Sequence, residues 1–148
     1  MLLEYTAQNN LNCAMVRFAA SKKDIVVHLF KAKQYTTDDV LKFAESFLCG
    51  GTDFEAPLTK AVELIEHEDF QNADVVFITD GYCAAISDEF ASDFCDKSHQ
   101  LKFTVTGILI DTDAPGWDFS LESFCKKIYR LSELTEDNIA ADIIKNKY

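Results

Sequence analysis

The chain has 148 residues, 48% of them hydrophobic, which is enough apolar material for the core of one globular domain over residues 1–148. Its formal net charge of −11 repels phosphate backbones and anionic membranes, so we expect no nucleic-acid partner and no membrane contact. The sequence has no basic secretory start and no apolar run near the ~20 residues of a membrane span, which predicts a cytoplasmic protein.

The first elements, in chain order, are predicted to be a helix, a hairpin and a second helix. A helical pattern covers residues 1–9. Two β-rich runs, 12–20 and 24–31, are joined by a polar turn, which predicts an antiparallel hairpin. An acidic start signal then precedes a short helix over residues 40–48.

The remaining elements alternate between helix and strand. A helix with apolar positions between Leu58 and Ile65 precedes the strand 74–79, whose apolar sequence predicts burial on both faces. Ser87 is a good N-cap for the next helix. The elements after it are a strand over 103–110, a helix over 121–128, a short strand over 128–131 and a closing helix over 136–145. This alternation predicts an α/β fold, a Rossmann-like three-layer sandwich whose mostly parallel sheet has one antiparallel edge strand.

Two loops carry the candidate site. The first, Gly50-Gly51-Thr52-Asp53, opens a helix, and the second, Thr79-Asp80-Gly81, closes a buried strand. A hydroxyl at one strand-to-helix junction and a carboxylate at the next can meet at one edge of a parallel sheet, where α/β folds place their ligands. Asp111 and Asp113 follow the next strand at the same edge, although a surface-loop role is the favoured interpretation for both. The loops together predict a metal or anion site in outline.

These residues also have purely structural interpretations. Thr52 and Glu55 fit an S/T-x-x-E capping box, although Pro57 cannot donate the early helical hydrogen bond that this cap requires. Asp53 fits a helix-start acid favoured by the helix dipole. Asp80 fits a strand-end Asp-Gly turn, and its place after an apolar run favours a role in the site.

The cysteines and the lone tryptophan favour structural roles. The five cysteines are odd in number, widely spaced and free of C-x-x-C pairs, which predicts reduced thiols. Cys49 and Cys83 flank the predicted edge, but no histidine is near either in sequence, so we expect buried thiols rather than nucleophiles. Trp117, in a loop, is expected to pack in the core.

Over residues 2–148 the order of elements resembles a von Willebrand factor A (vWA) domain, in particular the small bacterial cytoplasmic branch encoded beside MoxR-type AAA+ ATPases and similar to CoxE and ViaA proteins. The most specific stretch is 48–80, where the Gly-Gly-Thr loop, its helix and the strand ending in Thr-Asp-Gly fall in family order. The resemblance implies a Mg²⁺ ion held by an Asp-x-Ser-x-Ser loop, by Thr52 and by Asp80, with a partner's carboxylate completing the shell. It also implies a MoxR-type ATPase as the protein partner.

One part of that motif is missing. No Asp-x-Ser-x-Ser sequence occurs in the chain, so the fold is predicted to be a vWA-like domain that is truncated at its N-terminus and lacks the first strand with its metal loop. Three explanations stay open: a start codon set too late, direct pairing of strands 12–20 and 74–79, or a homodimer through exposed strand edges. Two loops cannot supply a full oxygen shell, so Mg²⁺ binding by this chain is expected to be weak or absent.

Two classes of function follow from these features. The first is a protein-interaction module with a partial metal-ion-dependent adhesion site, which is not an enzyme. The alternative is a Mg²⁺-dependent phosphoryl-transfer enzyme that uses Asp80, Asp111 and Asp113 as a carboxylate cluster. A polyanionic substrate needs local cations, and neither of the two arginines, Arg17 and Arg130, is predicted near the edge. The interaction module is therefore favoured.

Overall fold

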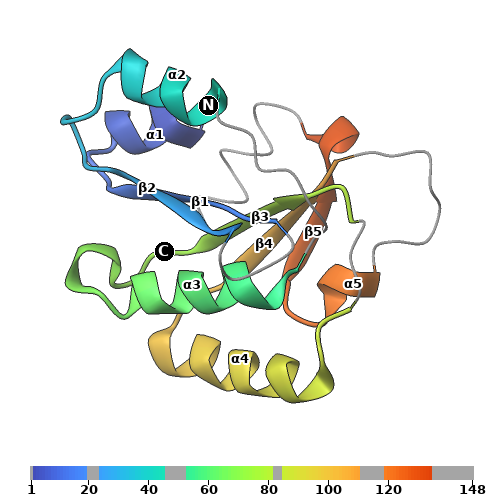
Figure 1. Cartoon of the computed structure of the whole chain (residues 1–148). Helices are drawn as coiled ribbons and strands as arrows, with labels where there is room; N and C mark the ends of the chain where they lie inside the picture. The colour runs from blue at the N-terminus through green and yellow to red at the C-terminus, as the bar shows by residue number, and fades with distance from the viewer. Residues whose placement is uncertain (1, 20–23, 46–52, 82–84, 111–118, 135–148) are drawn as a thin grey trace. The chain divides into compact units, whose positions relative to one another are not determined.

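The computed structural model describes residues 2–19, 24–45, 53–81, 85–110 and 119–134, which form a mixed α/β structure (Figure 1). The described strands form a two-stranded antiparallel sheet and a three-stranded parallel sheet. Contacts divide the chain into two compact units, Met1–Gln71 and Asn72–Tyr148, each with one of the sheets. A single domain over the whole chain stays a prediction. None of the described helices combines the length and the apolar character needed to cross a membrane.

The first unit is a β-hairpin with helices on both of its sides. Figure 1 shows α1 and α2 on one side of the hairpin and α3 on the other. Strands β1 and β2 pair antiparallel, with Met15 opposite His28, which confirms the predicted hairpin. The elements are α1 (Leu2–Gln8), β1 (Cys13–Arg17), β2 (Val26–Phe30), α2 (Thr37–Glu45), α3 (Glu55–Ile65) and the 3₁₀ turn η2 (Glu68–Phe70).

Helix α3 begins two residues later than a Thr52 cap would place it. Its N-cap is Phe54, and the Asp53 carboxylate accepts a hydrogen bond from the Glu55 backbone N–H at 2.9 Å. Pro57 falls in the first turn, where a missing N–H loses no intrahelical hydrogen bond. Asp53 is therefore the helix-start acid that the sequence predicted.

The second unit is a parallel sheet in the order β3-β4-β5, covered by helices. Ser87 caps α4 by accepting from the Phe90 N–H at 3.3 Å, as its sequence position predicts. The elements are β3 (Val75–Thr79), α4 (Asp88–Leu101), β4 (Val105–Leu109), α5 (Phe119–Glu122), β5 (Lys127–Arg130) and the 3₁₀ turn η3 (Leu131–Glu133).

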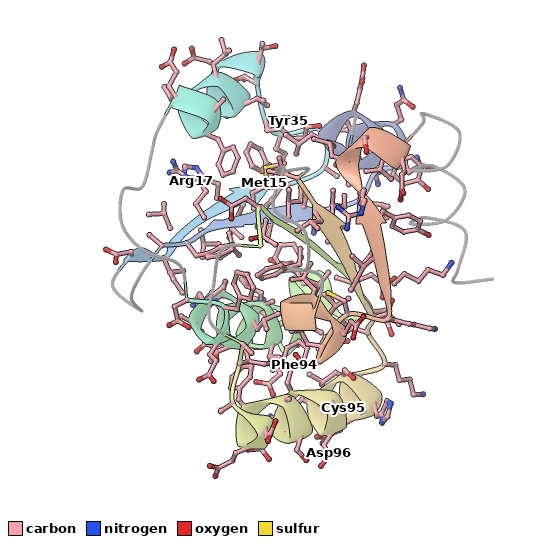
Figure 2. The ribbon with its side chains drawn as sticks, turned by 90° about the vertical axis from the view of Figure 1, so that its right-hand side faces the viewer. Met15, Arg17, Tyr35, Phe94, Cys95 and Asp96 are labelled. Carbon is pink, nitrogen blue, oxygen red and sulfur yellow. The ribbon has the colours of Figure 1, made fainter. Side chains whose placement is uncertain are left out.

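Aromatic rings form the core of the second unit. Phe94, on the inner side of α4, is 4% exposed and packs edge-on against Phe103 at 5.6 Å and Phe124 at 6.4 Å, measured between ring centroids. Phe124 in turn contacts Phe77 of β3 at 5.2 Å. Figure 2 shows Asp96 on the other side of α4 from Phe94, so the helix has one apolar face toward the sheet.

Two sequence predictions for the second unit are wrong in part. The helix predicted over 121–128 stops at Glu122, because a turn closes with the Cys125 N–H donating to the Leu121 carbonyl and Lys127 already belongs to β5. The strand 74–79 is not buried on both faces, since Ile78 is 48% exposed. The closing helix 136–145 lies outside the described residues, and direct pairing of strand 12–20 with strand 74–79 stays a prediction.

Candidate functional site

The carboxyl end of β3 is a turn with one buried and one exposed polar side chain. The Thr79 side chain is buried, and its Oγ1 accepts from the Gly81 N–H at 3.0 Å. Gly81 has φ of 80°, a left-handed conformation that glycine adopts without strain. Asp80, between them, is exposed. Gly81 thus has the backbone conformation that the predicted Asp-Gly turn requires, and Asp80 lies exposed at the end of the strand.

Three neighbouring strands end together at this position. Thr79 is in register with Leu109, which is in register with Arg130, and the Ile110 N–H donates to the Thr79 carbonyl at 2.7 Å. This end of the sheet also carries three exposed aliphatic side chains, which we call the apolar edge patch: Ile78 (48% exposed), Ile110 (41%) and Leu131 (50%). The sequence pattern did not indicate this patch, because each member lies beside ordinary strand residues.

Arg130 corrects one sequence inference. It was not expected near the candidate edge, but it is the last residue of β5, two strands from Thr79 in the register of the sheet. Two strand spacings correspond to about 10 Å between backbones. Its backbone N–H donates to the Glu133 carboxylate at 3.5 Å. The backbone of Arg130 therefore lies at the same end of the sheet as Thr79, the residue before Asp80.

The other predicted site residues lie in different units or outside the described residues. Asp53 belongs to the first unit and Gly81 to the second. Gly50, Gly51, Thr52, Asp111 and Asp113 lie outside the described residues, as do Cys49, Cys83 and Trp117. Over the parts of the chain that the structure describes, no group of three or more His, Cys, Asp or Glu side chains is placed to hold a metal ion. Metal ligation by Thr52 and Asp80 stays a prediction.

Two of the described thiols, those of Cys13 and Cys125, are poor nucleophiles. Cys13, Cys95 and Cys125 are free cysteines, in agreement with the predicted reduced state. Burial raises the pKa of the Cys13 thiol, and it raises the pKa of the Cys125 thiol to about 12. A thiol with so high a pKa stays protonated near neutral pH, and the protonated form does not attack electrophiles.

One histidine has a polar role that its sequence position did not predict. The Arg17 Nη2 atom lies 3.1 Å from His28 Nε2, and because guanidinium can only donate, the imidazole nitrogen accepts. The same guanidinium lies 5.0 Å from the ring centroid of Phe43 in a cation–π contact. Arg17 is thereby held on the side of the hairpin that faces α2 (Figure 2).

Comparison with known proteins gives relatives but no family. The chain is similar to two uncharacterized proteins of Methanocaldococcus jannaschii, one 36% identical over 81 residues and the other 28% identical over 138 residues. The matches cover 54% and 93% of this chain but only 18% and 33% of those proteins, so the chain spans at most about a third of the length of these relatives. No family model matches the chain, and no solved structure matches it.

Proposed function

We propose that this chain is a protein-interaction module and that the apolar edge patch, with Asp80 and Arg130, is its contact surface. The observation that carries the proposal is the placement of three large exposed aliphatic side chains on adjacent strand ends. Single exposed aliphatic residues are common on any protein, whereas a group of them at one place marks a surface that is buried by another molecule.

The charges at the patch are suited to protein recognition. Asp80 and Arg130 bring one negative and one positive group to the two outer strands. Apolar contacts with charged groups at the margin are typical of protein interfaces, where arginine is enriched. The described end of the sheet contains no pair of a nucleophile and a base, so the chemistry present favours binding over turnover.

The finer part of the proposal follows the resemblance to vWA domains. In it, the two units are parts of one Rossmann-like three-layer domain, Thr52 and Asp80 contribute to a Mg²⁺ site, and a MoxR-type AAA+ ATPase is the partner. The exposure of Asp80 after a parallel strand supports this proposal, because a metal-bridged contact needs an accessible carboxylate at that place.

A second candidate function has one specific observation in its favour. Arg130 supplies the cation that a phosphoryl-transfer site requires near its carboxylates. In this alternative Asp80, Asp111 and Asp113 hold Mg²⁺ and Arg130 binds the phosphoryl oxygens. The net charge of −11 still opposes a polyanionic substrate, so we place this function second.

Pull-down of a purified MoxR-type ATPase from the source organism tests the first proposal. We expect replacement of two patch residues, Ile110→Ser with Leu131→Ser, to weaken capture at least about tenfold, since each loses an apolar contact. The matched control is Leu29→Ser, which replaces an aliphatic side chain that is 53% exposed on β2. Asp80→Asn should remove any Mg²⁺ dependence of capture.

Two results would contradict the proposal. The first is capture that is equally strong with the patch variant and the Leu29→Ser control. The second is hydrolysis of p-nitrophenyl phosphate at a rate that falls in both Asp80→Asn and Arg130→Gln, which would establish the enzyme instead.

A further inference from the structure

One aromatic ring of α2 lies against the hairpin of the first unit. No residue of this helix is buried, and Leu41 is 52% exposed. Phe43, which is half-buried, packs edge-on against the rings of His28 at 5.0 Å and Phe30 at 6.1 Å, measured between ring centroids. The Arg17 guanidinium lies 5.0 Å from the centroid of the same ring. Because a helix without buried residues gains little from apolar burial, its attachment depends on these contacts of Phe43.

Two of the groups that contact Phe43 also bond to each other. Met15 is opposite His28 in the hairpin and Arg17 is two residues after Met15, so the Arg17 and His28 side chains project from the same face. The Arg17 Nη2 atom lies 3.1 Å from His28 Nε2. Guanidinium has donors only, so this contact requires a neutral imidazole with its proton on Nδ1.

Protonation of His28 would turn this attraction into a repulsion. The imidazolium Nε2 is a donor and cannot accept from Arg17, and two positive charges would lie 3.1 Å apart. The guanidinium keeps its proton near neutral pH, whereas imidazole groups take one up between about pH 8 and 5. The contact is therefore present while His28 is neutral and is lost as the pH falls through this range.

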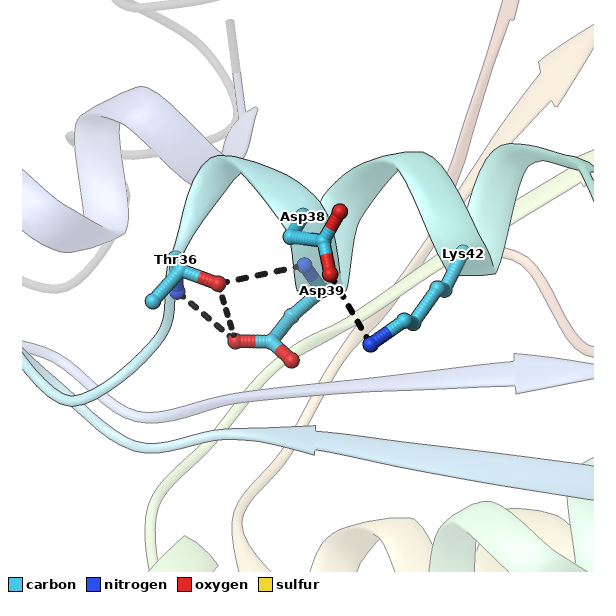
Figure 3. A network of polar contacts seen from close by, with 4 residues as sticks. All are labelled: Thr36, Asp38, Asp39 and Lys42. Carbon is cyan, nitrogen blue, oxygen red and sulfur yellow. Dashed lines mark hydrogen bonds and ion pairs between the residues drawn. The ribbon is translucent and has the colours of Figure 1, made fainter.

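Two other titratable groups near His28 do not change charge in this range. Asp39 lines the same hollow as His28, a space of about 410 Å³ beside β2, and its Oδ2 atom accepts from the Thr36 backbone N–H and hydroxyl, each at 2.8 Å (Figure 3). The backbone hydrogen bond and then the hydroxyl lower the pKa of Asp39 below 3.8, so this carboxylate stays ionised. Cys13 is opposite Phe30 on the same face, and burial raises the pKa of its thiol, which stays neutral.

The lysines that line the hollow are each paired with an acid. Lys42 pairs with Asp38 at 2.9 Å (Figure 3), and Lys31 pairs with Asp69 at 3.9 Å. Ammonium and carboxylate groups of such exposed pairs keep their charges between about pH 8 and 5. Over the described residues, a pH response of this face in that range therefore points to His28.

We propose that the contact between Arg17 and His28 is a pH-sensitive latch, which holds α2 against the hairpin at neutral pH and releases it when His28 is protonated. Both groups of the latch also contact the Phe43 ring, so their separation disturbs two contacts of that ring at once. Helix α2 has no buried residue to hold it in place and leaves the hairpin. The first unit thus opens on the α2 side at mildly acidic pH.

Nuclear magnetic resonance of the isotope-labelled full chain tests the latch at about pH 7.5 and 5.5, on either side of the usual imidazole titration. We expect nuclear Overhauser effects between the His28 and Phe43 rings at the higher pH and their loss at the lower. Corrected for intrinsic exchange rates, the protection factors of amides 41–45 should fall at least about tenfold, because α2 opens locally. Those of α4 should change less than about twofold, because α4 belongs to the other unit.

Variants assign the response to the two groups of the latch. His28→Gln keeps an acceptor for Arg17 and does not titrate, so the protection of α2 should be the same at both pH values. His28→Phe, which keeps a ring beside Phe43, gives the same test if the glutamine variant does not hold α2. Arg17→Gln removes the positive charge and should abolish most of the response. The matched controls His67→Gln and His99→Gln remove exposed imidazoles elsewhere and should retain it fully.

Four results would overturn the proposal. They are unchanged α2 protection and ring contacts between the two pH values, a full response in both His28 variants, a full response in Arg17→Gln, and an equal loss of protection in α4, which would indicate general unfolding. Circular dichroism of each variant at both pH values checks that it is folded.

Discussion

The two units bury their strands to different extents. Four of the five residues of β4, the central strand of the parallel sheet, are buried, and the fifth is half-buried. All five residues of β1, in the hairpin, are half-buried. The parallel sheet is thus packed around an aromatic core, whereas the hairpin keeps polar and charged groups such as Arg17 and His28 among its rings.

This difference indicates which side chains and which substitutions each unit tolerates. A strand buried between two partners has no room for polar groups, and its stability depends on packing volume. A hairpin that is half-covered can hold hydrogen-bonded polar side chains beside rings and leave a hollow next to them. We therefore expect core substitutions to be most damaging in the second unit and substitutions on the hairpin to be better tolerated.

The largest effect is expected for Phe94→Ala in the core of the second unit. Removing a buried phenyl ring leaves a cavity beside Phe103 and Phe124 and should lower the free energy of unfolding by about 3–5 kcal/mol. Urea denaturation followed by circular dichroism measures it. If this variant does not fold, Phe94→Leu should give a smaller, measurable loss.

Leu29→Ala is the matched control in the hairpin. Leu29 is 53% exposed, so its truncation should change the free energy of unfolding by no more than about 0.5 kcal/mol. Similar losses for Phe94→Ala and Leu29→Ala would show that the two units do not differ in packing as described.

A smaller effect is expected at the centre of β4. A Cβ atom added at Gly107 would lie 3.0 Å from the Cys125 sulfur, which is closer than ordinary van der Waals contact. Gly107→Ala should therefore destabilise the protein by about 1–3 kcal/mol, the range for overpacking a core. Thermal or urea denaturation gives the value.

The double variant Gly107→Ala with Cys125→Ala identifies the cause. With the sulfur removed, alanine at 107 should be nearly neutral or slightly stabilising relative to glycine, since glycine in a strand is disfavoured by about 0.5–1 kcal/mol. Additive effects of the two substitutions would show that crowding against Cys125 is not the reason.

The smallest effect is expected at the exposed start of α2. Hydrogen bonds from the backbone and then the hydroxyl of Thr36 lower the pKa of Asp39 below its usual value of 3.8. Asp39 therefore contributes stability above pH 3.8, and this contribution is lost as the pH falls through the lower pKa of the folded state. The urea midpoint of Asp39→Asn should lie slightly below that of the native protein at neutral pH and meet it at acidic pH.

Asp38→Asn is the comparison for that experiment. Asp38 pairs with Lys42 across one turn of the same helix, and both side chains are at least 70% exposed. The loss of stability in Asp38→Asn should depend on salt concentration at neutral pH, because salt screens exposed ion pairs. A difference for Asp39→Asn that persists unchanged at low pH would exclude the proposed hydrogen-bonded carboxylate as its cause.

Much of the local structure was predictable from a few residues. The Ser87 cap and the backbone at Gly81 follow from side chains that bond backbone groups within three positions of themselves. The hairpin follows from two β-rich runs that are close in the sequence. The helix predicted over 121–128 failed for the opposite reason. Lys127 and the residues after it pair with β4, some twenty positions earlier, and this distant partner overrides the local helical pattern.

By itself, then, the sequence determined the alternation of elements, the helix start at Ser87 and the expectation of a carboxylate at a strand end, because these depend on local spacing and capping. Tertiary structure alone decided which strand ends are neighbours. It brought Arg130 and the apolar edge patch to the end of the sheet that carries Asp80. It also placed the Cys125 sulfur against Gly107 and made a hollow beside β2. Register between strands is set by packing over the whole sheet, and no short motif encodes it.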